Sequence, residues 1–299
     1  MFSKIIVPLD GSKAAEVALP YARSLAGKLH LDIELIAAVD VTELARSVSA
    51  AEGLFLDRVA DDESRRLREY LSAIASSFAG VEVGCRVDKG PAADVIINAA
   101  AQPETLINMA THGRSGLNRW LLGSVAEKIL RAASGPLLLV RAAMQAASAG
   151  RATLKSIIAP LDGSQLAEQA LPAVIDLARR LDIEVILFRA YAVPSAAFAG
   201  AKSYSLDTDR LVAEMAAAAT EYLRGESEML KQAGVKKVNC VAKEGLSADE
   251  ILKFAREKPD SLIAMCAHGR SGIKRWVLGS VTETVVRHAN APVLIVRGS

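Results

Sequence analysis

Two glycine-rich turns contain the residues of this chain that are best suited to chemistry. The stretch from Gly113 to Val125 reads GRSGLNRWLLGSV and the stretch from Gly269 to Val281 reads GRSGIKRWVLGSV, so ten of thirteen positions are identical. Each turn follows an apolar run and precedes a helical pattern. Glycine allows the backbone to approach a ligand closely, and the first N–H groups of a helix attract anions. The pattern therefore predicts two turns that bind phosphate.

A serine follows the last glycine of each turn, and two roles are open to it. Ser124 and Ser280 stand where a helix is expected to begin, so their hydroxyls are candidate N-caps. A bound phosphate would compete for the same N–H groups, and both roles cannot be complete at once. Because three glycines recur at a fixed spacing in both copies, we favour the phosphate. The glycines expected beside it are Gly113, Gly116 and Gly123 in the first copy and Gly269, Gly272 and Gly279 in the second.

An aspartate precedes a Gly-Ser pair in each half of the chain. Asp10 and Asp162 stand in the repeated sequence Pro-Leu-Asp-Gly-Ser, which begins at Pro8 and at Pro160. Aspartate is common in such positions because its side chain closes an Asx-turn. The alternative is a hydrogen bond to a ribose hydroxyl or a contact through a divalent cation. Given the glycine turns, we favour contact with a ligand.

Arginine and histidine accompany each glycine turn. Arg114 and Arg270 would neutralise phosphate charge if they face the ligand, and would otherwise be solvated. His112 and His268 have no partner at metal-ligand spacing, so we expect them to be structural or at the rim of the pocket rather than catalytic. The sequence has no GxxxxGK[ST] loop, no GxGxxG fingerprint and no GxSxG elbow, and it identifies no nucleophile with its base.

The elements that must position these residues occur twice. Ile5 to Ser12 reads IIVPLDGS, and seven of these eight residues return from Ile157 to Ser164. A repeat of about 150 residues indicates a duplicated domain. We therefore expect an N-terminal domain of residues 1–143 and a C-terminal domain of residues 154–299, joined by a segment rich in alanine, serine and glycine.

Within each domain, five apolar strands alternate with helices. This order predicts an α/β fold with a five-stranded parallel sheet flanked by helices, of the Rossmann-like type. Asp10 follows the first strand and the glycine turn follows the fourth, so both meet at one crevice if these strands are neighbours. A long helix over residues 54–78 is expected to carry Glu63 on its outer face. The other elements expected in the first copy are strands over residues 4–9, 32–39, 81–87, 105–110 and 136–141, and helices over residues 12–28, 91–101 and 124–132.

The composition limits the classes of partner. The 299 residues carry a net charge of +2, which is too balanced for nucleic acid or an anionic membrane as the main partner. Three cysteines without a C-x-x-C pair favour a reducing compartment. No uncharged apolar stretch approaches the ~20 residues that a membrane span needs. We expect a cytoplasmic protein that binds neither nucleic acid nor a membrane.

The glycine turns and the Pro-x-Asp openings resemble those of the universal stress protein family, in its tandem two-domain form. ATP-binding members of that family carry a glycine, two residues, a second glycine, nine residues and then Gly-Ser or Gly-Thr. Here nine residues separate Gly113 from Gly123 and Gly269 from Gly279. The resemblance covers nearly the whole chain.

The first glycine of the family motif is replaced in both copies. Ala110 and Cys266 stand at this position. If the position needs a positive φ, a residue other than glycine costs on the order of 1–2 kcal/mol, which is about a tenfold loss of affinity. If the position still belongs to the strand, a small residue costs little.

The resemblance implies a set of contacts with an adenine nucleotide, in a fold like that of the adenine nucleotide alpha hydrolases. The aspartates would contact ribose or a cation, and adenine would meet the backbone at Ala38 and Ala190. Thr282 offers phosphate a hydroxyl that Ala126 lacks, so we expect unequal sites, with the C-terminal site tighter if Cys266 fits. The implied site residues are Pro8, Asp10, Ala38, Ala110, His112, Gly113, Arg114, Gly116, Gly123, Ser124 and Val125 in the N-terminal domain, and Pro160, Asp162, Ala190, Cys266, His268, Gly269, Arg270, Gly272, Gly279, Ser280, Val281 and Thr282 in the C-terminal domain.

The same resemblance implies that the bound nucleotide is ATP, ADP or AMP. Whether Mg²⁺ accompanies it is left open by the residues. We expect a stress-response protein in which the nucleotide shifts a conformational or assembly equilibrium rather than serving mainly as a substrate. A slow ATPase or adenylyl-transfer enzyme and a nucleotide-free interaction scaffold stay open as alternatives. The final apolar strand of each domain would pair the two domains within the chain, and a homodimer of chains is a further expectation.

Overall fold

The structure, a computed structural model, divides into two compact units between Thr153 and Leu154. We call them the N-terminal unit and the C-terminal unit. The residues that the structure describes are 2–47, 55–102, 104–112, 122–141, 150, 152–192, 205–267 and 278–298.

The N-terminal unit is built on five parallel strands. These are β1 (Lys4–Pro8), β2 (Asp32–Val39), β3 (Val83–Lys89), β4 (Thr105–Ala110) and β5 (Leu137–Val140). Within the unit they lie in the order β3-β2-β1-β4-β5. β1 and β4 are neighbours, with Ile5 opposite Leu106, so the carboxyl ends of the first and fourth strands meet. The adjacency on which the predicted crevice depends is therefore present.

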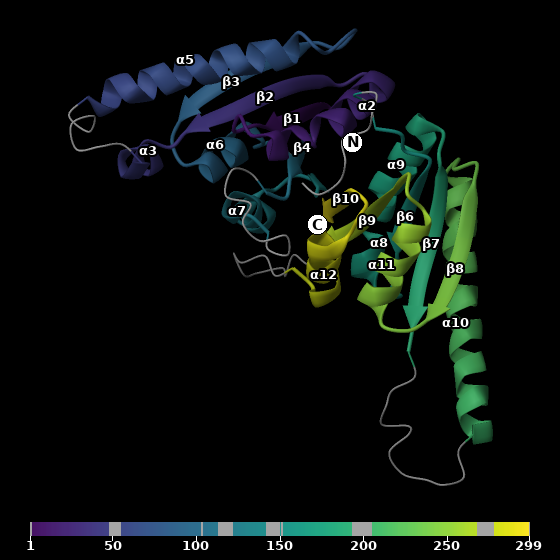
Figure 1. Ribbon diagram of the computed structural model, residues 1–299. Helices are drawn as coiled ribbons and strands as arrows, with labels where there is room; N and C mark the ends of the chain where they lie inside the picture. The colour runs from purple at the N-terminus through teal and green to yellow at the C-terminus, as the bar shows by residue number, and fades with distance from the viewer. Residues whose placement is uncertain are drawn as a thin grey trace. The chain divides into compact units, whose positions relative to one another are not determined.

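Helices cover both faces of this sheet. They are α1 (Lys13–Glu16), α2 (Leu19–Leu29), α3 (Val41–Ser47), α5 (Leu56–Ala75), α6 (Ala92–Ala99) and α7 (Ser124–Ala132). Figure 1 shows α5 running along β2 and β3 on one face, while α6 packs against β2 on the other. Every residue of β4 is buried, which explains why its sequence is apolar throughout rather than alternating.

Two parts of the N-terminal unit differ from the sequence-based prediction. The helix expected over residues 12–28 is two helices, α1 and α2, because Pro20 lacks an N–H group and is accommodated in the first turn of a new helix. Helix α3 was not predicted. It begins after Asp40, whose Oδ1 accepts hydrogen bonds from the N–H groups of Thr42 (3.0 Å) and Glu43 (3.1 Å) as an N-cap does.

The C-terminal unit repeats this plan. Its strands are β6 (Ser156–Pro160), β7 (Glu184–Tyr191), β8 (Val238–Glu244), β9 (Ser261–Ala267) and β10 (Val293–Arg297), and within the unit they lie in the order β8-β7-β6-β9-β10. Its helices are α8 (Gln165–Glu168), α9 (Leu171–Leu181), α10 (Ser205–Gln232), α11 (Ser247–Glu257) and α12 (Ser280–His288). All four strand pairings are parallel. The predicted fold class, two repeated five-stranded parallel sheets flanked by helices, is confirmed.

The strand registers of the two units match, so positions can be compared one to one. Pro8 lies opposite Ile36 across β1 and β2, and Pro160 lies opposite Phe188 across β6 and β7. Lys4 pairs with Thr105 just as Ser156 pairs with Ser261. Among the described helices, none is long and apolar enough to cross a membrane.

Candidate functional site

A cavity of about 390 Å³ opens at the carboxyl ends of β1, β2 and β4, beside the first turn of α7. This is the end of a parallel sheet at which ligands bind, and the volume lies within the range of small-molecule sites. The cavity wall includes predicted site residues from four separate elements. They are Pro8, Asp10, Ala38, Ala110, His112, Gly123, Ser124 and Val125.

The remaining predicted site residues fall into two groups. Gly113, Arg114 and Gly116, and in the C-terminal unit His268, Gly269, Arg270 and Gly272, lie outside the described residues. The others hold the corresponding places in the C-terminal unit. They are Pro160, Asp162, Ala190, Cys266, Gly279, Ser280, Val281 and Thr282.

The first turn of α7 presents backbone N–H groups to the cavity. Gly123 is the N-cap residue, and no side chain among the residues that the structure describes caps the turn that follows. The alternative in which Ser124 is the N-cap is therefore wrong, because Ser124 is already the first helical residue. In α12, Gly279 takes the same place with φ −62° and ψ 146°. Groups of this kind, left without a capping side chain, are suited to an anion.

The glycine at this N-cap is required by a close approach of two backbones. The N–H group of Gly123 donates to the carbonyl of Thr111 at 2.9 Å, which joins the end of β4 to the start of α7. A Cβ atom on Gly123 would lie 3.1 Å from that same oxygen. A residue with a Cβ atom therefore requires a shift of a few tenths of an ångström between the helix start and the strand.

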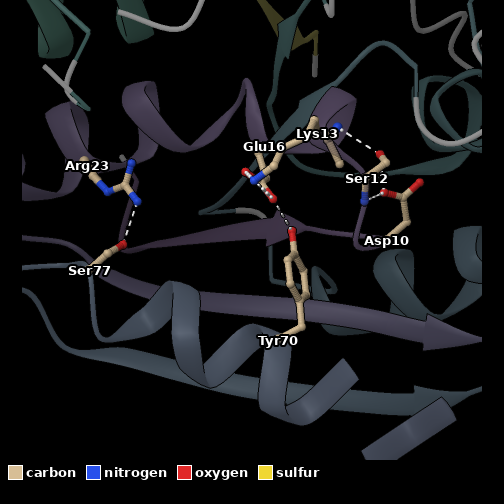
Figure 2. A network of polar contacts seen from close by, with 8 residues as sticks. Asp10, Ser12, Lys13, Glu16, Arg23, Tyr70 and Ser77 are labelled. Carbon is tan, nitrogen blue, oxygen red and sulfur yellow. Dashed lines mark hydrogen bonds and ion pairs between the residues drawn. The ribbon is translucent and has the colours of Figure 1, made fainter. Parts of the chain in front are cut away.

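Asp10 closes an Asx-turn at the cavity wall. Its Oδ1 accepts hydrogen bonds from the N–H group (2.9 Å) and the hydroxyl (2.6 Å) of Ser12, and the Ser12 hydroxyl in turn caps α1 at Ala15. Figure 2 shows Asp10 and Ser12 at this turn, with Lys13 and Glu16 on the helix that follows. The turn reading is thus correct, and the lining of the cavity by the same residue leaves ligand contact compatible with it.

The replaced glycine of the family motif lies in ordinary strand backbone. Ala110 is the last residue of β4, and Cys266 lies inside β9. Among the described residues other than glycine, only His30 and Asp182 have a positive φ. A small side chain is therefore accommodated at this position without backbone strain.

His112 is held by the residue before it. The Thr111 hydroxyl lies 3.0 Å from Nδ1 of His112, and Nε2 is buried with no hydrogen-bond partner among the described residues. Burial, followed by the positive charge of Arg141, lowers the pKa of His112 below its ordinary value, so the ring is neutral near pH 7. A neutral imidazole with one nitrogen bonded and one unmatched can serve a ligand oxygen.

Acidic side chains that the sequence did not indicate line the other side of the cavity. Asp40 directly precedes the unpredicted helix α3, Glu43 lies on that helix, and Glu63 comes from α5. Glu63 was expected on the outer face of its helix, but it lies at the cavity and pairs with Arg66 at 2.6 Å. Apolar residues such as Ile36, Ile96 and Met109 also line the cavity.

The model of the Universal stress protein family matches residues 1–141 and, a second time, residues 153–297. The chain belongs to this family. It carries two copies of the family domain. The members of this family are stress-response proteins. A universal stress protein of Methanocaldococcus jannaschii is 34% identical over 151 residues, which cover 50% of this chain and 85% of that protein.

Solved structures of the same family share the fold. A universal stress protein of Archaeoglobus fulgidus superposes with a TM-score of 0.72 at 20% identity, covering 98% of each chain, so the likeness extends over both units and concerns the fold alone. Another universal stress protein, solved in complex with cAMP, is 22% identical with a TM-score of 0.36 and covers 50% of this chain and 100% of that one.

Proposed function

We propose that this universal stress protein binds an adenine nucleotide in the N-terminal cavity and that the nucleotide regulates the protein's part in the stress response. The observation that carries the proposal is the start of α7, which has no capping side chain among the described residues and borders a cavity of about 390 Å³ that apolar side chains help to line. A nucleotide needs an anion-binding end and an apolar slot a few ångströms away. The same cavity offers both.

The phosphates would lie at the α7 end. The N–H groups of the first helical turn, from Ser124 onward, and the helix dipole favour negative charge there. Gly123 lets this turn come close to β4, and the unmatched Nε2 of His112 supplies a further polar atom beside it. These features support binding of phosphate, and none of them is a catalytic base.

The nucleoside would lie against the apolar residues that line the cavity. Asp10 is placed to accept a hydrogen bond from a ribose hydroxyl, and the backbone at Ala38 borders the slot for the base. Carboxylates at the rim, Asp40 and Glu43, are acceptors for an exocyclic amine of the kind that adenine carries. This polarity supports an adenine nucleotide rather than a free phosphate.

A divalent ion fits this site only if the phosphates of the nucleotide supply some of its ligands. The described residues include no group of three or more His, Cys, Asp or Glu side chains that could hold a metal ion. Mg²⁺ commonly uses one or two carboxylates together with phosphate oxygens and water. Asp10 would be the carboxylate on this chain, and the ion would reduce the repulsion between phosphates and the acidic rim.

The proposal is tested by calorimetric titration of the purified chain with ATP, ADP and AMP, with GTP as the specificity control. We expect saturable binding of the adenine nucleotides and a rise in melting temperature, because a ligand that binds only the folded state stabilises it. Mass spectrometry of ligand released from the purified protein should identify an adenine nucleotide. Absence of both results contradicts the proposal.

A glycine pair provides the matched variants. Gly123→Ala should lower the affinity by roughly tenfold or more, because the added Cβ meets the Thr111 carbonyl and displaces the helix start. Gly27→Ala, in α2, adds the same methyl group where no atom lies within 4 Å, and should bind like the wild type. Turnover of ATP at roughly 1 s⁻¹ or faster would instead favour an enzyme.

A further inference from the structure

We infer that the two units are not equivalent sites: the N-terminal cavity takes the nucleotide, while the ring of Phe188 fills the base end of the corresponding place in the C-terminal unit. The inference rests on the proposed function and adds to it a specificity-determining residue and a stoichiometry of one nucleotide per chain.

The equivalence of Ile36 and Phe188 follows from the backbone. Ile36 lies opposite Pro8 and Phe188 opposite Pro160, each in the second strand of its unit. The carbonyl of Ile36 accepts from Leu9 N at 2.8 Å, and that of Phe188 accepts from Leu161 N at 2.8 Å. Because side chains alternate along a strand, matched register sends both side chains to the same face of the sheet.

The helices that cover this face are equivalent as well. Gly90 precedes α6 with φ +142° and donates to the Val39 carbonyl at 2.9 Å. Gly245 precedes α11 with φ +143° and donates to the Tyr191 carbonyl at 2.8 Å. Counting from these glycines, Phe254 on α11 takes the place of Ala99 on α6.

Two aromatic rings therefore stand where the N-terminal unit has smaller residues. Ile36 forms part of the cavity wall. Ile36 and Phe188 are both almost fully buried, at 1% and 0% exposure, but the ring centroid of Phe188 lies 5.2 Å from that of Phe254, with an angle of 34° between the ring planes. Paired rings at this spacing pack favourably and resist displacement. Of the two counterparts only Ile36 lines the N-terminal cavity, so a nucleotide base entering this end of the C-terminal unit would have to move the Phe188 ring.

The rim of the C-terminal unit lacks polar groups that the N-terminal cavity has. Ala192 follows β7 where Asp40 follows β2, and Ala267 stands in place of Thr111, which holds His112. In addition, Arg189 replaces Ala37 and lies over the Tyr222 ring at 4.6 Å. Ala37 lies in the second strand, Asp40 directly follows that strand and Thr111 directly follows β4, whereas the glycine N-cap of the phosphate end is retained.

The test is the stoichiometry of ATP binding to the full chain, measured by calorimetry in the presence of Mg²⁺. We expect one nucleotide per chain in the wild type. Ile36→Phe, which brings the C-terminal residue into the N-terminal cavity, should lower the affinity by about tenfold or more. Phe188→Ile combined with Phe254→Ala should raise the stoichiometry toward two, because space for a base is opened.

Controls and contrary outcomes keep the two proposals separate. Gly27→Ala and Gly225→Ala, each with no atom within 4 Å of the added methyl group, should bind one nucleotide as the wild type does. Two sites of equal affinity in the wild type overturn this inference and leave the proposed function standing. Binding by no form of the chain overturns both. Circular dichroism checks the fold of each variant, and the wild-type stoichiometry decides the question even if a variant does not fold.

Discussion

The two units share their backbone and differ in what their second strands present to the site. The Asx-turns agree closely: Ser12 N lies 2.9 Å from Oδ1 of Asp10, and Ser164 N lies 2.9 Å from Oδ1 of Asp162. The side chains of the second strand differ between the units: Ile36 in β2 corresponds to Phe188 in β7. A duplication can therefore retain a binding scaffold in both copies while a single enlarged side chain changes what one copy admits.

The charge around the matched aspartates differs too. Burial acts to raise the pKa of Asp162, but the hydrogen bonds from Ser164 and the positive charge of Arg189 outweigh it, so the pKa lies below its ordinary value. The N-terminal unit has Ala37 in place of this arginine. A guanidinium beside Asp162 competes with any cation that would otherwise approach the carboxylate.

The largest expected difference between the units is in packing. Phe188→Ala should lower the free energy of unfolding by about 3–5 kcal/mol, since it empties a fully buried ring position. Ile36→Ala should cost about 2 kcal/mol, near the lower end for buried aliphatic residues, because Ile36 already borders a cavity. Urea unfolding of the full chain measures both. An equal cost would mean that the aromatic ring does not fill a packed space.

The caps should behave alike in both units. Ser12→Ala and Ser164→Ala each remove a hydroxyl that accepts from a helix N–H group at 3.2 Å. Each should cost about 1 kcal/mol of stability. Thermal unfolding of the two variants provides the comparison, and a large gap between them would contradict the identity of the two turns.

Substitution by glycine at the left-handed residue that ends the second helix should stabilise the two units by modestly different amounts. His30 and Asp182 both have φ +53° and both end the second helix of their unit. His30→Gly should stabilise by about 1 kcal/mol, because glycine adopts this conformation without a steric cost. Asp182→Gly should gain less, since it also removes the ion pair with Lys236 at 2.9 Å. Melting temperatures in high and low salt separate the two contributions.

The smallest expected effect is a pH dependence that comes from His112 in the N-terminal unit. The folded pKa of His112 is lowered by burial and by Arg141, so the unfolded state binds more protons than the folded state once the pH falls below about 6.5. Stability should therefore decrease as the pH drops through that window. Urea unfolding at about pH 7.5 and about pH 5.5 should show a smaller decrease in His112→Gln than in the wild type. An unchanged difference would place the effect elsewhere.

Much of the fold could be predicted because the strands and the helix beside the site are determined by local pattern. The expected ranges for β2, β4 and α7 agree with the structure at both ends. The predictions failed where a single residue decides whether a helix begins or ends. Pro20 divides the first helix, and Asp40 begins α3 by capping it with its side chain.

The sequence predicted the glycine turn and the aspartate of the site better than the other side chains that line the cavity. Strand adjacency brings Asp10 and Gly123 to one cavity, as the order of elements suggested, whereas the place of Glu63 depends on the rotation of α5 about its axis. Ile36 and Phe188 are both apolar, so no hydrophobic pattern separates them. Thr282, from which a tighter C-terminal site was expected, is 5% exposed, and the enlarged ring at Phe188 now argues for the opposite order.

The hydrogen bond between Gly123 N and the Thr111 carbonyl has a consequence for protein engineering. It ties together the two points at which the chain leaves β4 and enters α7, 2.9 Å apart. Both points border the cavity, and the predicted phosphate turn with Gly113, Arg114 and Gly116 lies between them in the sequence. A tag or a fluorescent reporter peptide should therefore be inserted elsewhere in the chain if nucleotide binding is to be kept.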